Sequence, residues 1–299
     1  MRKLPQLSLA TIEAREARDW TQEDLAEKSG LSIATISRIE TGKIKTLKRH
    51  TLRVLHETLK LPLDVLGLGI EPQLKMVMEN ELLALLRPVF LKKYEIAQAD
   101  LTHFKERYSE YIGTSYFDQL ILLGESVVFH HPEIRQKGLN KAIKGIRLSQ
   151  EKVIVDKNKK GLVLDFQYIE MTAFNLIEYA LIKAIADELG RQRKYPQSLR
   201  TSQALIVSLQ KPTVDQSITM RLFPVICHNT AVSLRHLNKH TEALGYANQG
   251  INYCVDNSNT RPLVGLYQLV SDIYQDLHDP PNAHLYQQKC QQILLLLEE

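Results

Sequence analysis

Residues 21–43 have the sequence TQEDLAEKSGLSIATISRIETGK, and this stretch decides the fold of the N-terminal part of the chain. Thr21 is followed three residues later by Asp24, a near match to a capping box, which predicts the start of a helix. Gly30 predicts the end of that helix, because glycine tolerates the left-handed conformation common at helix C-termini. Ser32 predicts the cap of a second helix. Two short helices joined by about four residues have the geometry of a helix-turn-helix.

The flanking sequence predicts further helices on both sides of this motif. Apolar residues keep a helical spacing from Leu9 to Ala17 and again from Leu52 to Leu61, and Pro62 begins a short last segment. We therefore expect an all-α fold in which residues 1–68 form a five-helix DNA-binding domain.

The 23 residues quoted above resemble the Cro/C1-type (XRE) family of repressors at fixed spacing. The resemblance implies that Gln22 anchors a DNA phosphate, and that Arg15 and Glu40 pair inside the bundle. It places the third helix in the major groove and the loop lysines along the DNA backbone. The implied DNA-binding residues are Gln22, Ser32, Ile33, Ala34, Thr35, Ser37, Arg38, Lys43 and Lys45.

Two positions on the implied recognition helix bear on sequence specificity. Arg38 is the best candidate for a base contact, since a guanidinium can donate two hydrogen bonds to guanine; the alternative is a phosphate contact. Ile33 departs from the family pattern, where a polar residue is common. An isoleucine cannot hydrogen-bond a base edge, but it could touch a thymine methyl group. Specificity should therefore depend also on dimer spacing and DNA shape.

The remaining residues predict a second helical domain. The segment around Gly67–Pro72 interrupts any helix, so we expect a linker at 69–74 and a repeat domain at 75–299. Two copies of a tetratricopeptide-like (TPR-like) helix pair recur 40 residues apart near the C-terminus. We expect a right-handed α-solenoid of such pairs. The predicted packing and small residues are Cys227, Ala231, Leu234, Asn238, Ala243, Ala247 and Gly250 in one copy, and Tyr267, Ser271, Tyr274, Leu277, Ala283 and Cys290 in the other.

An XRE head with such a tail resembles the Rgg/PlcR/PrgX (RRNPP) family of peptide-pheromone regulators. The resemblance implies a homodimer whose solenoid binds a short signalling peptide. It also implies that Asn229 holds the peptide backbone, and that Asn175 occupies a comparable place on an earlier helix, with Glu170 one and a half turns before it on that helix. Asparagine is a mediocre helix former, so two of them within helices invite an explanation. The alternative is that each holds a contact between helices.

Composition and charge exclude other classes of protein. The net charge is +4, and residues 1–70 hold twelve basic and nine acidic side chains, so the excess lies in the predicted DNA-binding part. Three cysteines without CxxC spacing indicate neither disulfides nor zinc. His236 and His240 lack the rest of a metal motif. We expect a cytoplasmic protein that is not an enzyme, with no cofactor, metal or membrane partner.

The sequence therefore predicts a quorum-sensing transcription regulator that binds palindromic or repeated DNA half-sites as a homodimer, under control of a short peptide. One alternative is a ligand-independent phage- or plasmid-type repressor whose tail only dimerises. Another is an adaptor whose DNA-binding head is vestigial. A basic cluster at Arg135–Lys160 could attract an acidic peptide terminus, extend the DNA contact, or simply face solvent.

Overall fold

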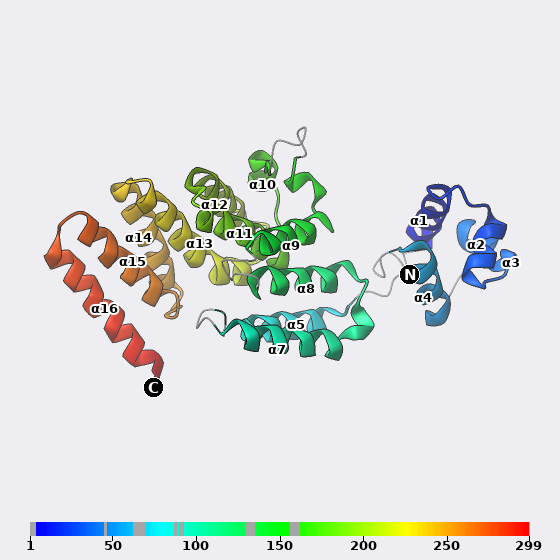
Figure 1. The fold of residues 1–299 in the computed structure, drawn as a ribbon, viewed down its shortest axis with the longest axis horizontal. Coiled ribbons are helices and arrows are strands. Elements are labelled where there is room, and N and C mark those ends of the chain that lie inside the picture. The colour runs from blue at the N-terminus through cyan, green and yellow to red at the C-terminus, as the bar shows by residue number, and fades with distance from the viewer. Residues whose placement is uncertain are drawn as a thin grey trace. The chain divides into compact units, whose positions relative to one another are not determined.

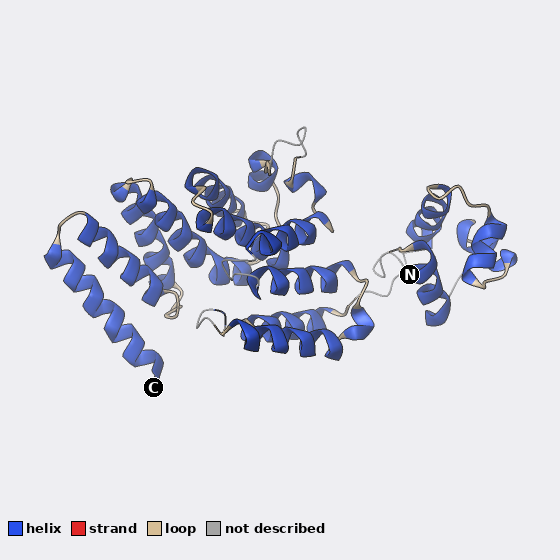
Figure 2. Cartoon of the chain, viewed as in Figure 1, coloured by secondary structure: helices blue, strands red, loops and turns tan. Residues whose placement is uncertain are grey.

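The computed structural model describes residues 4–44, 47–61, 70–86, 89, 93–128, 135–155 and 162–298. Every regular element within these ranges is a helix (Figure 2). The only strand-like pairing among them is an isolated antiparallel bridge between Ile154 and Leu164. The prediction of an all-α fold is confirmed.

The N-terminal helices enclose a small apolar core of their own. They are α1 (Leu4–Glu16), α2 (Gln22–Ser29), α3 (Ile33–Glu40) and α4 (Arg49–Leu59) (Figure 1). The helical spacing of apolar residues directs one stripe of each helix inward. The predicted fifth helix from Pro62 lies outside the described residues. The core side chains are Leu7, Leu25, Ala26, Ile36, Ile39, Leu52, Leu55, Leu59 and Leu61.

The chain divides into two compact units, Met1–Gly124 and Glu125–Glu299. Besides α1–α4, the first unit holds α5 (Pro72–Leu85), α7 (Tyr94–Arg107), a 3-10 turn and the start of α8 (Ser115–Val128). Pro72 is the first residue of α5, where its missing N–H has no helical partner to lose. The linker at 69–74 and the domain boundary it implies stay predictions.

The second unit consists of a short entry region followed by three helix pairs. The entry region contains α9 (Arg135–Arg147), a 3-10 turn and α10 (Phe166–Met171). The pairs pack in chain order, each helix against the next. They are α11 (Leu176–Arg191) with α12 (Tyr195–Leu209), α13 (Gln216–His236) with α14 (His240–Asp256), and α15 (Leu263–Asp276) with α16 (Pro280–Glu298).

The three pairs share one turn geometry. Arg193, Asn238 and His278 each adopt a positive φ of 57–60° between the two helices of a pair. In each turn the next residue donates its backbone N–H to a carbonyl five residues earlier, at 2.9 Å. This is the long hydrogen bond of a Schellman motif, formed here without glycine. The α11/α12 pair has the same turn as the two pairs predicted from the sequence.

Most residues predicted at packed positions are buried, among them Cys227, Ala231, Ala247, Ser271 and Ala283. Close approach is possible because small side chains face the neighbouring helix. At Gly250 an added Cβ atom would lie 3.1 Å from Cys227 Cβ. For Asn238 and Leu277 the prediction was wrong: Asn238 is exposed in the turn, and Leu277, 44% exposed, caps the C-terminus of α15.

The first helices of the three pairs form one continuous face. α11, α13 and α15 contact one another more closely than α12, α14 and α16 do. A stack of helix pairs curves toward the helices that lie closer together. We call the face formed by α11, α13 and α15 the inner face.

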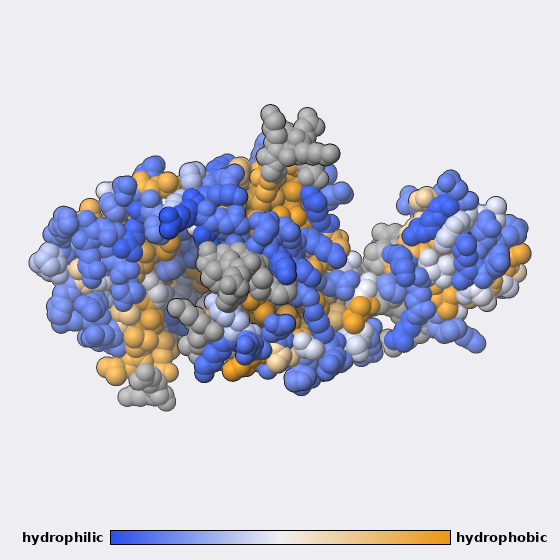
Figure 3. Space-filling view, viewed as in Figure 1, coloured by the Kyte–Doolittle hydropathy of each residue, from blue (hydrophilic) through white to orange (hydrophobic). Residues whose placement is uncertain are grey.

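The last helix carries an apolar surface. Leu294–Leu297 at the end of α16 are between 43% and 66% exposed. Figure 3 shows apolar atoms gathered over this end of the helix. Contiguous apolar patches on a protein surface mark sites of association.

Candidate DNA-binding and peptide-binding sites

The helix-turn-helix geometry predicted from local signals is present. Thr21 Oγ1 accepts the backbone N–H of Asp24 at 3.1 Å, and Asp24 Oδ2 accepts that of Thr21 at 2.8 Å, so the capping box is complete. These hydrogen bonds hold the pKa of Asp24 below its usual value. Gly30 ends α2 with φ +67°, and Ser32 caps α3 by accepting the N–H of Thr35 at 3.2 Å.

The predicted recognition residues divide into an exposed set and a half-buried set. Ser32, Ile33, Ala34 and Arg38 are exposed. Thr35 and Ser37 are half-buried, while Ile36 and Ile39 on the opposite stripe face the core. α3 therefore presents its first turn and Arg38 to the outside, as a helix entering the major groove must.

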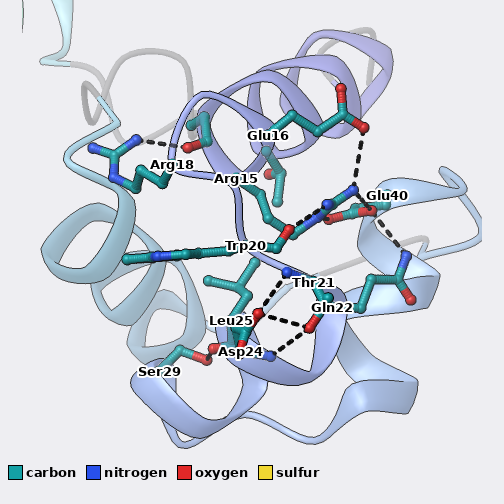
Figure 4. Close-up of polar contacts among 12 residues, drawn as sticks. Arg15, Glu16, Arg18, Trp20, Thr21, Gln22, Asp24, Leu25, Ser29 and Glu40 are labelled. Atoms are coloured by element: carbon teal, nitrogen blue, oxygen red, sulfur yellow. Dashed lines mark hydrogen bonds and ion pairs between the residues drawn. The ribbon is translucent and has the colours of Figure 1, made fainter.

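A buried carboxylate ties α1, α2 and α3 together (Figure 4). Glu40 is 8% exposed and accepts two hydrogen bonds from Arg15, from Nε at 2.7 Å and from a terminal nitrogen at 3.1 Å. The hydrogen bond with Glu40 raises the pKa of Arg15 further above its usual value. Bidentate pairing of this kind is geometrically specific. The predicted Arg15–Glu40 pair is confirmed.

Gln22 has a partner that the sequence did not predict. Its Nε2 donates to Glu40 Oε2 at 2.9 Å, so the same carboxylate holds both Arg15 and Gln22. Gln22 lies at the first position of α2, where the backbone N–H groups of the helix start favour an anion. The predicted phosphate site is therefore a helix start whose glutamine is already positioned by Glu40.

Trp20 is a second feature that the sequence did not predict. The Arg18 guanidinium and the Lys28 ammonium lie 5.7 and 5.1 Å from the centre of its ring. Arg18 also donates to the carbonyl of Leu59 at 2.9 Å. These contacts join the α1–α2 turn to the end of α4, so the tryptophan acts as a platform for two cations.

The basic residues after α3 remain candidates for phosphate contacts. Lys43, Lys48, His50 and Arg53 are exposed. Lys45 lies outside the described residues. In the later basic cluster, Lys141 pairs with Glu125 at 2.6 Å, and residues 157–160 lie outside the described residues.

On the inner face, Asn229 joins α13 to α11. Its Nδ2 donates to Asp187 Oδ1 at 2.5 Å, and Asp187 also pairs with Lys183 at 2.6 Å. All three side chains are half-buried. The prediction that Asn229 lies within a helix is confirmed, and the alternative that it holds a contact between helices is confirmed as well. The aspartate fixes the orientation of the amide, because only the NH2 side can donate to it.

His228 continues this network toward α15. Its Nδ1 lies 3.0 Å from Asn229 Oδ1, which must accept, so Nδ1 carries the proton. Burial lowers the pKa of His228, against the raising effect of this hydrogen bond, and the charge of Lys183 lowers it further. The imidazole is thus neutral near pH 7, with Nε2 as an acceptor.

An ion-pair cluster lies further along the same helices. Arg235 on α13 donates to Asp276 at 2.5 and 3.0 Å and to Asp272 at 3.1 Å, both on α15. The hydrogen bond from Arg235 lowers the pKa of Asp276. The inner face therefore carries two groups of ion pairs. Lys183 and Asp187 lie next to Asn229, and Arg235 with Asp272 and Asp276 lies further along.

The prediction that Asn175 lies within a helix was wrong. Asn175 is exposed and caps the start of α11, where its Oδ1 accepts the N–H groups of Ile177 at 2.9 Å and Glu178 at 3.0 Å. Glu178 Oε2 accepts the N–H of Asn175 in return, which completes a capping box. Glu170 lies on α10, a separate helix, where it pairs with Arg200. Asparagine is a preferred N-cap residue, so the stability of α11 accounts for the asparagine at position 175.

The two histidines considered as a metal pair lie on either side of a turn. His236 ends α13, where its ring stacks on that of Tyr195 with centres 4.4 Å apart, and His240 begins α14. No helix in the described part of the chain combines the length and apolar character needed to cross a membrane.

Residues 12–66 match the family model described as Helix-turn-helix. The N-terminal part of the chain is therefore a helix-turn-helix DNA-binding domain. No curated protein matches the sequence.

The fold of the chain is similar to that of regulators solved in complex with peptides. It is similar to PlcR of Bacillus thuringiensis, solved in complex with the peptide PapR7 and DNA, with 14% identity, 98% of this chain and 95% of that chain covered, and a TM-score of 0.55. It is also similar to the competence regulator ComR of Streptococcus vestibularis. The apo form has 14% identity, coverage of 98% and 93%, and a TM-score of 0.53. The complex with the signalling peptide XIP has 16% identity, coverage of 99% and 94%, and a TM-score of 0.52.

Proposed function

We propose that this protein is a transcription regulator that binds DNA through α3 and is controlled by a short signalling peptide bound on the inner face. The helix-turn-helix domain supports the DNA half of the proposal. The fold likeness to PlcR, solved with the peptide PapR7, and to ComR, solved with its signalling peptide XIP, supports the peptide half. A homodimer of such a protein would place two copies of α3 on half-sites about one helical turn apart, or a multiple of it.

The peptide-binding part of the proposal rests on the hydrogen-bonding capacity of the Asn229 side chain. A side-chain amide has two donors and two acceptor lone pairs. The Asn229 amide donates one N–H to Asp187 and accepts a hydrogen bond from His228. One N–H and one oxygen lone pair of the amide remain. One residue of an extended peptide offers one C=O and one N–H, so Asn229 can bind a peptide backbone without breaking its contact with α11.

Control of DNA binding requires that the peptide bind one arrangement of the dimer more tightly than another. A peptide on the inner face would contact α11, α13 and α15 at once, so its binding energy depends on their spacing. A change in that spacing alters the curvature of the repeats, and through it the separation of the two DNA-binding domains.

The test is calorimetric titration of the full chain with synthetic peptides encoded by short reading frames near its gene. We expect saturable binding that is weakened about fivefold or more by Asn229→Ala, since a peptide amide left without its hydrogen-bond partner costs about 1–3 kcal/mol. Asn248→Ala is the matched control, because Asn248 is exposed on α14, outside the inner face. Equal affinity of wild type and Asn229→Ala would refute the site.

Asn175 is tested by a pair of substitutions. Asn175→Asp keeps the cap but removes the amide donors, whereas Asn175→Ala removes both. If Asn175 contacts the peptide, Asn175→Asp weakens peptide binding. If it acts only as a cap, Asn175→Asp leaves peptide binding unchanged.

DNA binding that is insensitive to every such peptide would favour the ligand-independent repressor instead. The adaptor alternative predicts no specific operator. A protein that neutralises DNA phosphates loses affinity steeply as salt rises, so a salt-dependent footprint on a promoter would exclude the adaptor.

A further inference from the structure

The first turn of α3 exposes an apolar tip. Ile33 is 46% exposed and Ala34 is exposed, and neither belongs to the core of the domain. Ile36 and Ile39 on the same helix are fully buried, so the exposure of Ile33 does not reflect a shortage of apolar positions inside. The tip lies where a recognition helix first meets the base edges.

The hydroxyl groups beside this tip are engaged with each other. Ser32 Oγ and Thr35 Oγ1 lie 2.8 Å apart, and Ser32 Oγ also accepts the backbone N–H of Thr35. Turning the Ser32 hydroxyl toward a base would weaken the cap of α3, and Thr35 is half-buried. This leaves the exposed Ile33 and Arg38 as the side chains of α3 best placed to discriminate between bases.

In the major groove, the thymine methyl is the apolar group that a base pair presents, while the other base-edge groups are hydrogen-bond donors or acceptors. Contact with a thymine methyl removes apolar surface from water on both sides. Contact with a polar base edge would instead bury a donor or acceptor without a partner, which is unfavourable. An isoleucine at this position thus favours thymine and disfavours the other bases.

We propose that Ile33 determines sequence specificity by contacting the methyl group of one thymine in each half-site. This inference rests on the proposed DNA binding. Arg38 lies one turn after Ala34 and supplies the hydrogen-bonding contact to the same half-site.

The experiment removes the methyl group from the DNA and the apolar side chain from the protein. Duplexes bound by the full chain are selected from a random library at roughly 50 mM salt, where phosphate contacts are strong, with and without the candidate peptides. Each thymine of the selected half-site is then replaced by deoxyuridine, which lacks only the methyl group. We expect one position per half-site at which this weakens binding about fourfold, the effect of one buried methyl-sized group.

Ile33→Ala should abolish this sensitivity, so that thymine and deoxyuridine bind equally at that position. Ile33→Gln should change the selected base there to adenine, because a glutamine amide can form two hydrogen bonds to adenine. Leu9→Ala is the matched control: Leu9 is 58% exposed on α1, and its removal should leave the deoxyuridine profile unchanged.

Three results would count against the reasoning. A flat deoxyuridine profile, or one that is the same in wild type and Ile33→Ala, overturns the role of Ile33 and leaves DNA binding intact. Selection that enriches no duplex overturns the proposed DNA binding itself. The two failures are therefore distinguishable.

Discussion

Two glycines on α14 offer a matched test of how the helix pairs pack. Gly250 faces α13 and α15: an added Cβ would lie 3.1 Å from Cys227 Cβ and 3.1 and 3.2 Å from the two methyl groups of Leu266. Cys227 Cβ is fixed to the backbone of α13, so it can move only if that helix moves. Gly245 is exposed on the same helix, and its added Cβ would meet nothing within 4 Å.

The same substitution should therefore have opposite effects at the two positions. Replacing a helical glycine by alanine gains about 1 kcal/mol of helix propensity. At Gly245 no overpacking opposes this gain, so Gly245→Ala should stabilise the protein by nearly 1 kcal/mol. At Gly250, overpacking costs about 1–3 kcal/mol, so Gly250→Ala should destabilise by up to about 2 kcal/mol.

Urea unfolding followed by circular dichroism measures both free energies of unfolding. The separation of the two variants should be about 1–3 kcal/mol, or several degrees in Tm at about 2–4 °C per kcal/mol for the larger domains. If Gly250→Ala is as stabilising as Gly245→Ala, then α13 and α14 do not approach as closely as described. The packing of α14 against α13 and α15 would then have to be reconsidered.

Three further perturbations test the sites. Glu40→Ala should destabilise the helix-turn-helix domain by about 3 kcal/mol, because it removes the buried carboxylate that accepts hydrogen bonds from both Arg15 and Gln22, whereas Glu16→Ala, which removes only an exposed 3.5 Å contact with Arg15, should cost less than about 0.5 kcal/mol in the same denaturation assay. The folded-state pKa of His228 lies below the unfolded value of about 6.5, so below that pH the unfolded chain binds a proton that the folded chain does not. The free energy of unfolding should therefore fall as the pH drops below about 6.5. The fall should be smaller in His228→Gln. Asn175→Ala should lower the free energy of unfolding by about 1 kcal/mol and Asn175→Asp should not, and equal losses would refute the capping role.

Much of the N-terminal domain could be predicted because its signals are local. The capping box at Thr21, the left-handed Gly30 and the cap at Ser32 each depend on residues within four positions of one another. The repeat register was also accessible, since small residues recur every 40 positions where helices must approach closely. The failures at Leu277 and Asn175 have a common cause: helix periodicity does not locate helix ends to the residue.

The sequence by itself determined the classes of element, the helix-turn-helix and the repeat plan, because these follow from spacing along the chain. Only the tertiary structure decided which polar groups meet. Gln22 meets Glu40 across 18 residues, and Asn229 meets Asp187 across 42. Such pairs depend on how helices stack, which periodicity does not specify. The structure therefore separated two asparagines that the sequence treated alike, leaving Asn229 on the inner face and Asn175 as a helix cap.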